Sequence, residues 1–271
     1  MARQQFETLL LEEQGAVDWL TLNRPESLNA LNPTMVSELT HYFRDLATRP
    51  DRRIVVLRGA GRAFCAGLDI KAGGNSEEAL ALGTVQKGLQ SQREIAEIYL
   101  AMRRCPQPIV ALISGAACGG GFSLALASDI RIADSTAKMN CAYIRIGLGG
   151  CDMGSSYFLP RQVGSSVAAE LILTGKFINA QRSLDLGLVS QVVEPGQLEA
   201  AVEEDLQLML TNSPLGLRLS KEALNVNIDT GSLEAAIALE DRNQILCAQT
   251  ADAQEGMAAF AQRRAPEYRD A

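Results

Sequence analysis

Two segments rich in small residues could aim backbone N–H groups at a negatively charged oxygen. One spans residues 61–71, where Ala66 and Gly67 would let the backbone approach a ligand closely. The other spans residues 114–123 and carries three consecutive glycines at the expected start of a helix, where free N–H groups and the helix dipole favour an anion. Each segment follows a predicted strand, so the two could converge at one end of a sheet and form an oxyanion hole. Either segment alone is also compatible with an ordinary strand-to-helix turn.

Other arrangements of reactive side chains are poorly supported. The 114–123 segment has neither a following GK[ST] nor the GxGxxG spacing, so a phosphate or dinucleotide site is the weaker interpretation. His41 is the single histidine of the sequence, which disfavours a Ser-His-Asp triad and a multi-histidine metal site. The six cysteines show no CxxC spacing. We therefore expect no metal site.

Short apolar runs and longer amphipathic patterns alternate over most of the chain and must position these segments. Runs at 6–11 and 17–22 flank a polar turn and predict a hairpin. Buried strands are predicted at 54–57, 109–113, 130–133 and 188–193, and helices from about 34 and at 77–104, 122–128, 166–173 and 180–186. This alternation predicts an α/β core.

After Pro195 every predicted element is a helix. Helical patterns are predicted at 197–210, 215–226, 233–246 and 252–263. Apolar residues at spacings of three and four around Leu233 and Ile237 indicate a helix that packs along one face, on its own core or on a neighbouring chain. We therefore divide the chain into a core over residues 1–195 and a helical region over residues 196–271.

Charge and hydropathy argue against several classes of partner. The net charge is −7 and no long Lys/Arg run occurs, so the electrostatic footprint of a nucleic-acid-binding protein is missing. Glycines and serines interrupt the uncharged stretch at 109–128, which favours a buried strand, loop and helix over a membrane span. Acidic residues stand near the N-terminus, where a signal or transit peptide would lie. We expect a cytoplasmic protein that binds neither nucleic acid nor a membrane.

Several motifs in combination resemble the enoyl-CoA hydratase/isomerase (crotonase) family. They are the AFCAGLDI and GAACGGGFSLALASDI segments, Asn23-Arg24-Pro25 with Leu28-Asn29-Ala30-Leu31, Gly147-Leu148, Leu159-Pro160-Arg161, Leu171 with Thr174-Gly175, and Glu255-Gly256-Met257 with Ala259-Phe260. The resemblance implies a crotonase-like spiral of ββα turns with a helical C-terminal trimerisation region, assembled as a homotrimer or a dimer of trimers. It implies acyl-CoA thioester substrates and no separate cofactor, because coenzyme A is part of the substrate.

The resemblance also assigns roles to residues of this sequence. Leu68 and Gly120 would donate the two N–H bonds of the oxyanion hole. The residues along the adenine and pantetheine of coenzyme A would be Leu28, Ala30, Ala66, Asp69, Ile70 and Lys71.

The chain departs from the hydratase pattern at the two positions where family hydratases carry glutamates. These positions hold Ser123 and Tyr143, which do not exchange a proton near neutral pH as a carboxylate does and which we expect to line the pocket. Asp152 resembles the acidic residue of members that isomerise double bonds, although one additional residue precedes it. We take Asp152 as the candidate base; its alternative role is to cap a helix that begins near Ser155.

A single carboxylate beside an oxyanion hole can move a proton between two carbons of an acyl chain. We therefore expect an enoyl-CoA isomerase. A hydratase with altered catalytic residues is the first alternative, and a non-catalytic acyl-CoA-binding protein is the second. A decarboxylase or thioesterase is also open, because the fold does not fix the reaction.

Overall fold

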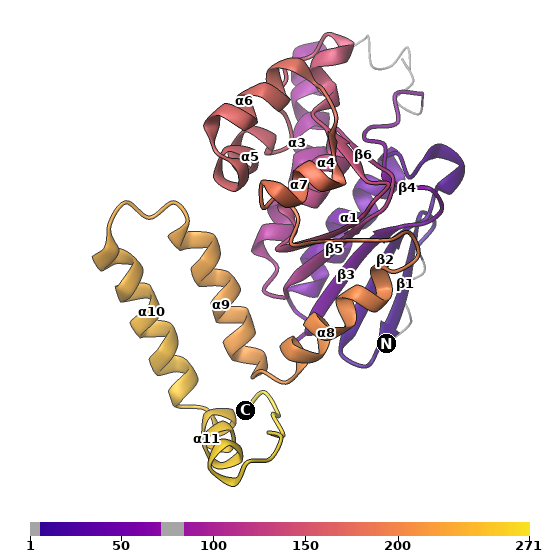
Figure 1. The fold of residues 1–271 in the computed structure, drawn as a ribbon. Coiled ribbons are helices and arrows are strands. Elements are labelled where there is room, and N and C mark those ends of the chain that lie inside the picture. The colour runs from indigo at the N-terminus through magenta and orange to yellow at the C-terminus, as the bar shows by residue number, and fades with distance from the viewer. Residues whose placement is uncertain (1–5, 72–83) are drawn as a thin grey trace. The chain divides into compact units, whose positions relative to one another are not determined.

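The computed structural model describes residues 6–71 and 84–271 (Figure 1). The chain divides into two compact units. One comprises Met1–Cys105 with Ile109–Ala201, and the other comprises Pro106–Pro108 with Val202–Ala271. Both sheets belong to the first unit, and all the regular structure described in the second unit is helical.

The first sheet has six strands in the order β1-β2-β3-β5-β7-β10. They are β1 (Leu9–Gln14), β2 (Val17–Leu22), β3 (Ile54–Gly59), β5 (Ile109–Ile113), β7 (Ile130–Asp134) and β10 (Gln191–Val193). The hairpin prediction is confirmed, although β1 runs on to Gln14 and the turn falls at Gly15, which adopts a positive φ of 58°. Strands β2 and β5 are buried along their whole length, as parallel strands covered on both faces must be.

The second sheet consists of very short strands that the sequence patterns did not reveal. They are β4 (Ala63–Cys65), β6 (Ala116–Cys118), β8 (Lys138–Asn140) and β9 (Ile178–Asn179), in the order β4-β6-β8-β9. Three times the chain passes from a strand of the first sheet into a strand of the second, from β3 to β4, β5 to β6 and β7 to β8. The first two of these pairs are followed by a long and a short α-helix, which gives a spiral of ββα turns.

Most helices of the first unit were predicted, and of α5 only its start near Ser155 was foreseen. They are α1 (Pro33–Leu46), α3 (Thr84–Arg104), α4 (Gly120–Ala127), α5 (Ser155–Val163), α6 (Ser165–Thr174), α7 (Ala180–Asp185) and the start of α8 (Leu198–Leu210), with the 3₁₀ segments η1 (Pro25–Ser27) and η2 (Ala142–Ile146). Residues 77–83 of the predicted helix 77–104 lie outside the described residues. Helix α1 begins where the Asn32 side chain accepts a hydrogen bond from Met35 N, with Pro33 at the first helical position.

The second unit contains α9 (Pro214–Asn227), α10 (Leu233–Ala248) and α11 (Ala251–Gln262), which confirm the predicted helical tail. Ser213, Ser232 and Thr250 cap their N-termini by accepting backbone hydrogen bonds. The chain end folds back onto α11, where the buried Asp252 accepts hydrogen bonds from the backbone N–H groups of Arg269 and Asp270. Among the helices of the described residues, none combines the length and the apolar character needed to cross a membrane.

Candidate active site

Pairing of β4 with β6 brings the two small-residue segments side by side. The strands are parallel, with Ala63 opposite Ala116 and Cys65 opposite Ala117. The backbones approach so closely that a Cβ on Gly121 would lie 2.1 Å from the carbonyl oxygen of Cys65. Glycine is therefore required at position 121 by packing, and the predicted convergence of the two segments is present in the structure.

The backbone of Leu68 lies near the start of α4. Leu68 forms a parallel bridge with Leu31, in which Leu31 N donates to Gly67 O (2.8 Å) and Asp69 N donates to Leu31 O (3.0 Å). Since N–H groups alternate in direction along an extended strand, the N–H of Leu68 points away from Leu31. A Cβ on Gly67 would lie 3.6 Å from Gly120 N, so the Leu68 and Gly120 backbones are neighbours.

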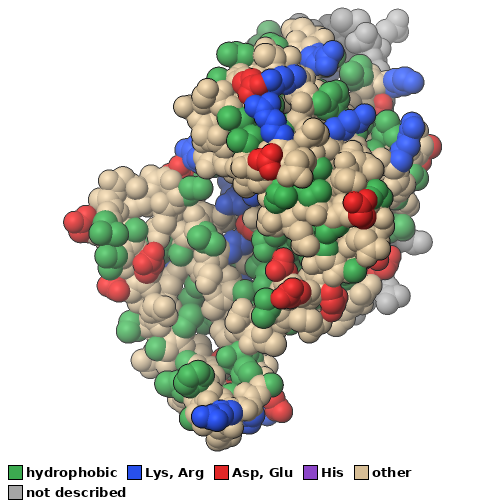
Figure 2. All heavy atoms as spheres, viewed as in Figure 1, with side chains coloured by type: hydrophobic (Ala, Val, Ile, Leu, Met, Phe, Trp, Pro, Cys, Tyr) green, Lys and Arg blue, Asp and Glu red, His purple; other side chains and the backbone are tan. Residues whose placement is uncertain are grey.

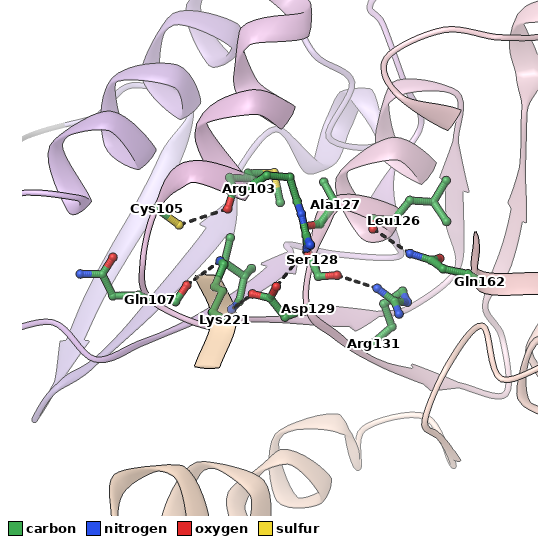
Figure 3. Close-up of polar contacts among 12 residues, drawn as sticks. Arg103, Cys105, Gln107, Leu126, Ala127, Ser128, Asp129, Arg131, Gln162 and Lys221 are labelled. Atoms are coloured by element: carbon green, nitrogen blue, oxygen red, sulfur yellow. Dashed lines mark hydrogen bonds and ion pairs between the residues drawn. The ribbon is translucent and has the colours of Figure 1, made fainter. Parts of the chain in front are cut away.

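Helix α4 presents its N-terminus to this point. It begins at Gly120, two residues earlier than predicted, and Gly119 precedes it with a φ of 50° and no side-chain cap. At its other end the carbonyl oxygens of Leu126, Ala127 and Ser128 accept hydrogen bonds from Gln162, Arg103 and Arg131, respectively (Figure 3). Cationic side chains at the C-terminus and uncapped N–H groups at the N-terminus both match the helix dipole. The start of α4 is therefore suited to an anionic oxygen.

Ser123 and Tyr143 face each other inside the site. Ser123 lies in the first turn of α4 and is fully buried, and its Oγ is 3.0 Å from Tyr143 Oη. Burial raises the pKa of Tyr143 far above its usual value, so the hydroxyl stays neutral near pH 7. The pair offers hydrogen bonds to a bound molecule and no ionisable carboxylate.

Asp152 stands beside this pair and does not cap a helix. The N-cap of α5 is Gly154, which has no side-chain cap hydrogen bond, so the capping role considered for Asp152 is absent. The Asp152 carboxylate instead accepts hydrogen bonds from Met153 N at 2.7 Å and from the side-chain amide of Gln92. Partial burial raises the pKa of Asp152. The charge of Asp152 in turn contributes to the raised pKa of Tyr143. A partly buried carboxylate with a raised pKa has the properties expected of a general base.

Two residues of α3, Gln92 and Tyr99, complete the site and were not singled out from the sequence. Tyr99 Oη donates to Gly120 O at 3.0 Å and lies 3.2 Å from the sulfur of Met153. Both residues stand on one side of α3, seven positions apart, and Tyr99 is buried. The sequence signal for these two residues was their spacing of seven positions in a predicted helix, which places both on one face.

The residues assigned to coenzyme A form two hydrogen-bonded segments. Ala66 N donates to Leu28 O (3.0 Å), and the Leu31 bridge joins the same two segments further on. Leu28 adopts a positive φ of 53°, Ala30 is buried, and Ile70 and Lys71 are exposed. The carboxylate of Asp69 is engaged by Arg24 at 2.9 Å, which ties the two segments together. The structure thus joins the segments that carry these residues on either side of Leu68.

A metal ion would require a group of ligand side chains among the described residues. Within residues 6–71 and 84–271, His, Cys, Asp and Glu side chains form no group of three or more that could hold a metal ion. The described groups that could act chemically here are the backbone N–H groups near Leu68 and Gly120, the neutral Ser123–Tyr143 hydroxyl pair and the Asp152 carboxylate.

Comparison with known proteins gives concordant matches. The model of the family described as enoyl-CoA hydratase/isomerase matches residues 12–271. A Mycobacterium tuberculosis protein named "Probable enoyl-CoA hydratase" is 38% identical over 93% of this chain and 88% of its own length. The 1,2-epoxyphenylacetyl-CoA isomerase of Escherichia coli is 32% identical over 97% and 98% of the two chains. The crystal structure of an enoyl-CoA hydratase from Bacillus anthracis superimposes with a TM-score of 0.89 at 30% identity, covering 98% of this chain and 100% of that one.

Proposed function

The chain belongs to the enoyl-CoA hydratase/isomerase family, and from this premise we propose that it is an enoyl-CoA isomerase. The observation that carries the proposal is the arrangement of proton carriers. Asp152 is a carboxylate beside the Ser123–Tyr143 pair, and Ser123 and Tyr143 are hydrogen-bonded to each other where family hydratases hold two glutamates. One base suffices for isomerisation, whereas hydration must both deprotonate a water and protonate a carbon.

In the proposed mechanism the thioester carbonyl oxygen accepts hydrogen bonds from the N–H groups of Leu68 and Gly120. The Asp152 carboxylate removes a proton from the α-carbon of a 3-enoyl-CoA, and the electron pair of the broken C–H bond moves into the thioester to form a dienolate. The oxyanion hole stabilises this negative charge. Asp152 then returns the proton to the γ-carbon, which yields the 2-enoyl-CoA and restores the carboxylate.

Ser123 and Tyr143 act as neutral hydrogen-bonding groups in this scheme. Burial holds the pKa of Tyr143 far above neutrality, so the phenol does not serve as a base. The pair instead orients the acyl chain or a water molecule. Asp152 alone carries the proton.

A hydratase with altered catalytic residues is the second candidate function. It is favoured by the names of the relatives, including the hydratase name of the Mycobacterium tuberculosis protein. In this scheme the Ser123–Tyr143 pair would hold the attacking water and Asp152 would deprotonate it. The two candidates differ in product.

We expect isomerase turnover to exceed hydratase turnover on matched substrates. The test is mass-spectrometric product identification after incubation with straight-chain 2-enoyl-, 3-enoyl- and dienoyl-CoAs, together with aryl-substituted acyl-CoAs of the class named for the Escherichia coli relative. Double-bond migration without a mass change supports isomerisation, and a gain of one water identifies hydration. Rapid hydration of 2-enoyl-CoA as the dominant reaction would contradict the proposal, and binding without turnover would favour a non-catalytic protein.

We also propose that the chain assembles in threes through its helical second unit. Large apolar side chains are exposed in this unit (Figure 2), among them Leu224, Ile228, Leu233, Ile245, Met257 and Phe260. Phe260 is 89% exposed, which favours a partner that covers it. Light scattering should give three or six times the 29.1 kDa mass of one chain. A monomer at micromolar concentration would contradict this prediction.

A further inference from the structure

The two oxygens of the Asp152 carboxylate have different surroundings. Oδ1 accepts two hydrogen bonds, one from the backbone N–H of Met153 and one from the side-chain amide of Gln92 on α3. For Oδ2, the hydrogen bonds among the described residues include none. The carboxylate is therefore held by one oxygen while the other is left to exchange a proton.

The backbone donor to Oδ1, the N–H of Met153, lies in an unusual turn. Met153 adopts a positive φ of 49°, and the next residue, Gly154, has a φ of 83°. A left-handed conformation is unfavourable for methionine, and such strain often marks a functional site. The Met153 N–H donates to Oδ1 of Asp152 at this turn, while the buried Met153 side chain reaches Tyr99 and Gly120.

We propose that Gln92 is a positioning residue that, together with the Met153 N–H, fixes Oδ1 of Asp152 so that Oδ2 carries the proton. This inference rests on the proposed function, in which Asp152 is the base. An amide suits the role because it donates a hydrogen bond without competing for the proton. Its donation also favours the ionised carboxylate over the acid.

The groups around Asp152 allow the effect of Gln92 to be isolated. Tyr99 from α3 and Tyr143 from η2 both interact electrostatically with Asp152. Burial raises the pKa of both phenols, so both remain neutral where the carboxylate titrates. Burial raises the pKa of Asp152 and the backbone N–H of Met153 lowers it. The Gln92 amide donates to the same oxygen, Oδ1, so loss of this donor should act in the same direction as burial.

The test compares Gln92→Leu with Gln90→Leu across a pH series. Gln90 lies on the same helix and donates to Glu94 at the surface, so it is a matched control. Loss of the Gln92 donor should raise the pKa of Asp152 and move the acid limb of the kcat/KM profile up by about one pH unit, with kcat reduced and KM little changed. Gln90→Leu should leave the profile unchanged. An unshifted limb in Gln92→Leu would overturn the proposal.

Two further variants test the role of Gln92 separately from the role of Asp152 as the base. Gln92→Glu preserves the size of the side chain but places a like charge beside Asp152, so the limb should move in the same direction and further. In an Asp152→Asn background, Gln92→Leu should change turnover by less than about twofold, because the two residues act through one group. If Asp152→Asn retains activity, the proposed function fails; if only the Gln92 variants leave the limb unshifted, this inference alone fails.

Discussion

Replacing Asp152 by asparagine is expected to lower isomerase turnover by about 10²- to 10⁴-fold, the usual value of general-base assistance. Asparagine preserves the shape of the side chain and can still accept hydrogen bonds from Met153 N and Gln92 through its carbonyl oxygen. It cannot remove a proton from carbon. The loss should therefore appear in kcat, while KM and the unfolding temperature stay close to those of the parent protein.

Steady-state rates with 3-enoyl-CoA would measure this effect, and Asp185→Asn provides the control. Asp185 is an exposed aspartate on α7 that accepts a hydrogen bond from Gln181, so its substitution should be silent. Burial raises the pKa of Asp152 above the ordinary aspartate pKa of about 3.9. The activity of the parent protein should therefore fall as the pH drops through this raised pKa, because the base becomes protonated. Full isomerase activity in Asp152→Asn would show that another residue is the base.

The sequence patterns predicted the strands and helices that carry strong local signals. The apolar run at 109–113 became β5 (Ile109–Ile113), and the 233–246 pattern became most of α10 (Leu233–Ala248). Strands β4 and β6 were missed because each has only three residues, mostly small ones, whose pairing is fixed by contacts between distant parts of the chain. The second sheet is therefore a tertiary feature.

The residues of the candidate site also differ in whether the sequence could identify them. The glycine segments around Leu68 and Gly120 could be identified because close backbone approach requires small residues in a recognisable order. Gln92 could not be identified in this way. Nothing in the sequence of α3 indicates that this helix contacts the loop that carries Asp152, 60 residues further along the chain. Polar contacts between elements depend on packing, which local patterns do not encode.

A second large effect is expected at the oxyanion hole. Gly120→Pro removes one N–H donor and should lower turnover by at least about 10²- to 10³-fold, or roughly 3–4 kcal/mol of transition-state stabilisation. Gly120 is the first residue of α4, a position where proline is tolerated because the N–H has no partner within the helix. The loss should therefore occur in a protein that still folds, as a thermal melt can establish.

Two control variants separate the backbone donor from the side chains around it. Gly120→Ala keeps the N–H and places a Cβ 3.0 Å from the ends of the Leu31, Met153 and Tyr99 side chains, which can shift by a few tenths of an ångström. Leu68→Ala keeps the other donor and trims a side chain that is 39% exposed, so it should alter pocket shape and retain appreciable activity. Because both variants preserve the N–H groups, each should be far more active than Gly120→Pro. Equal losses in well-folded Gly120→Ala and Gly120→Pro would mean that space at position 120, rather than its N–H, limits the reaction.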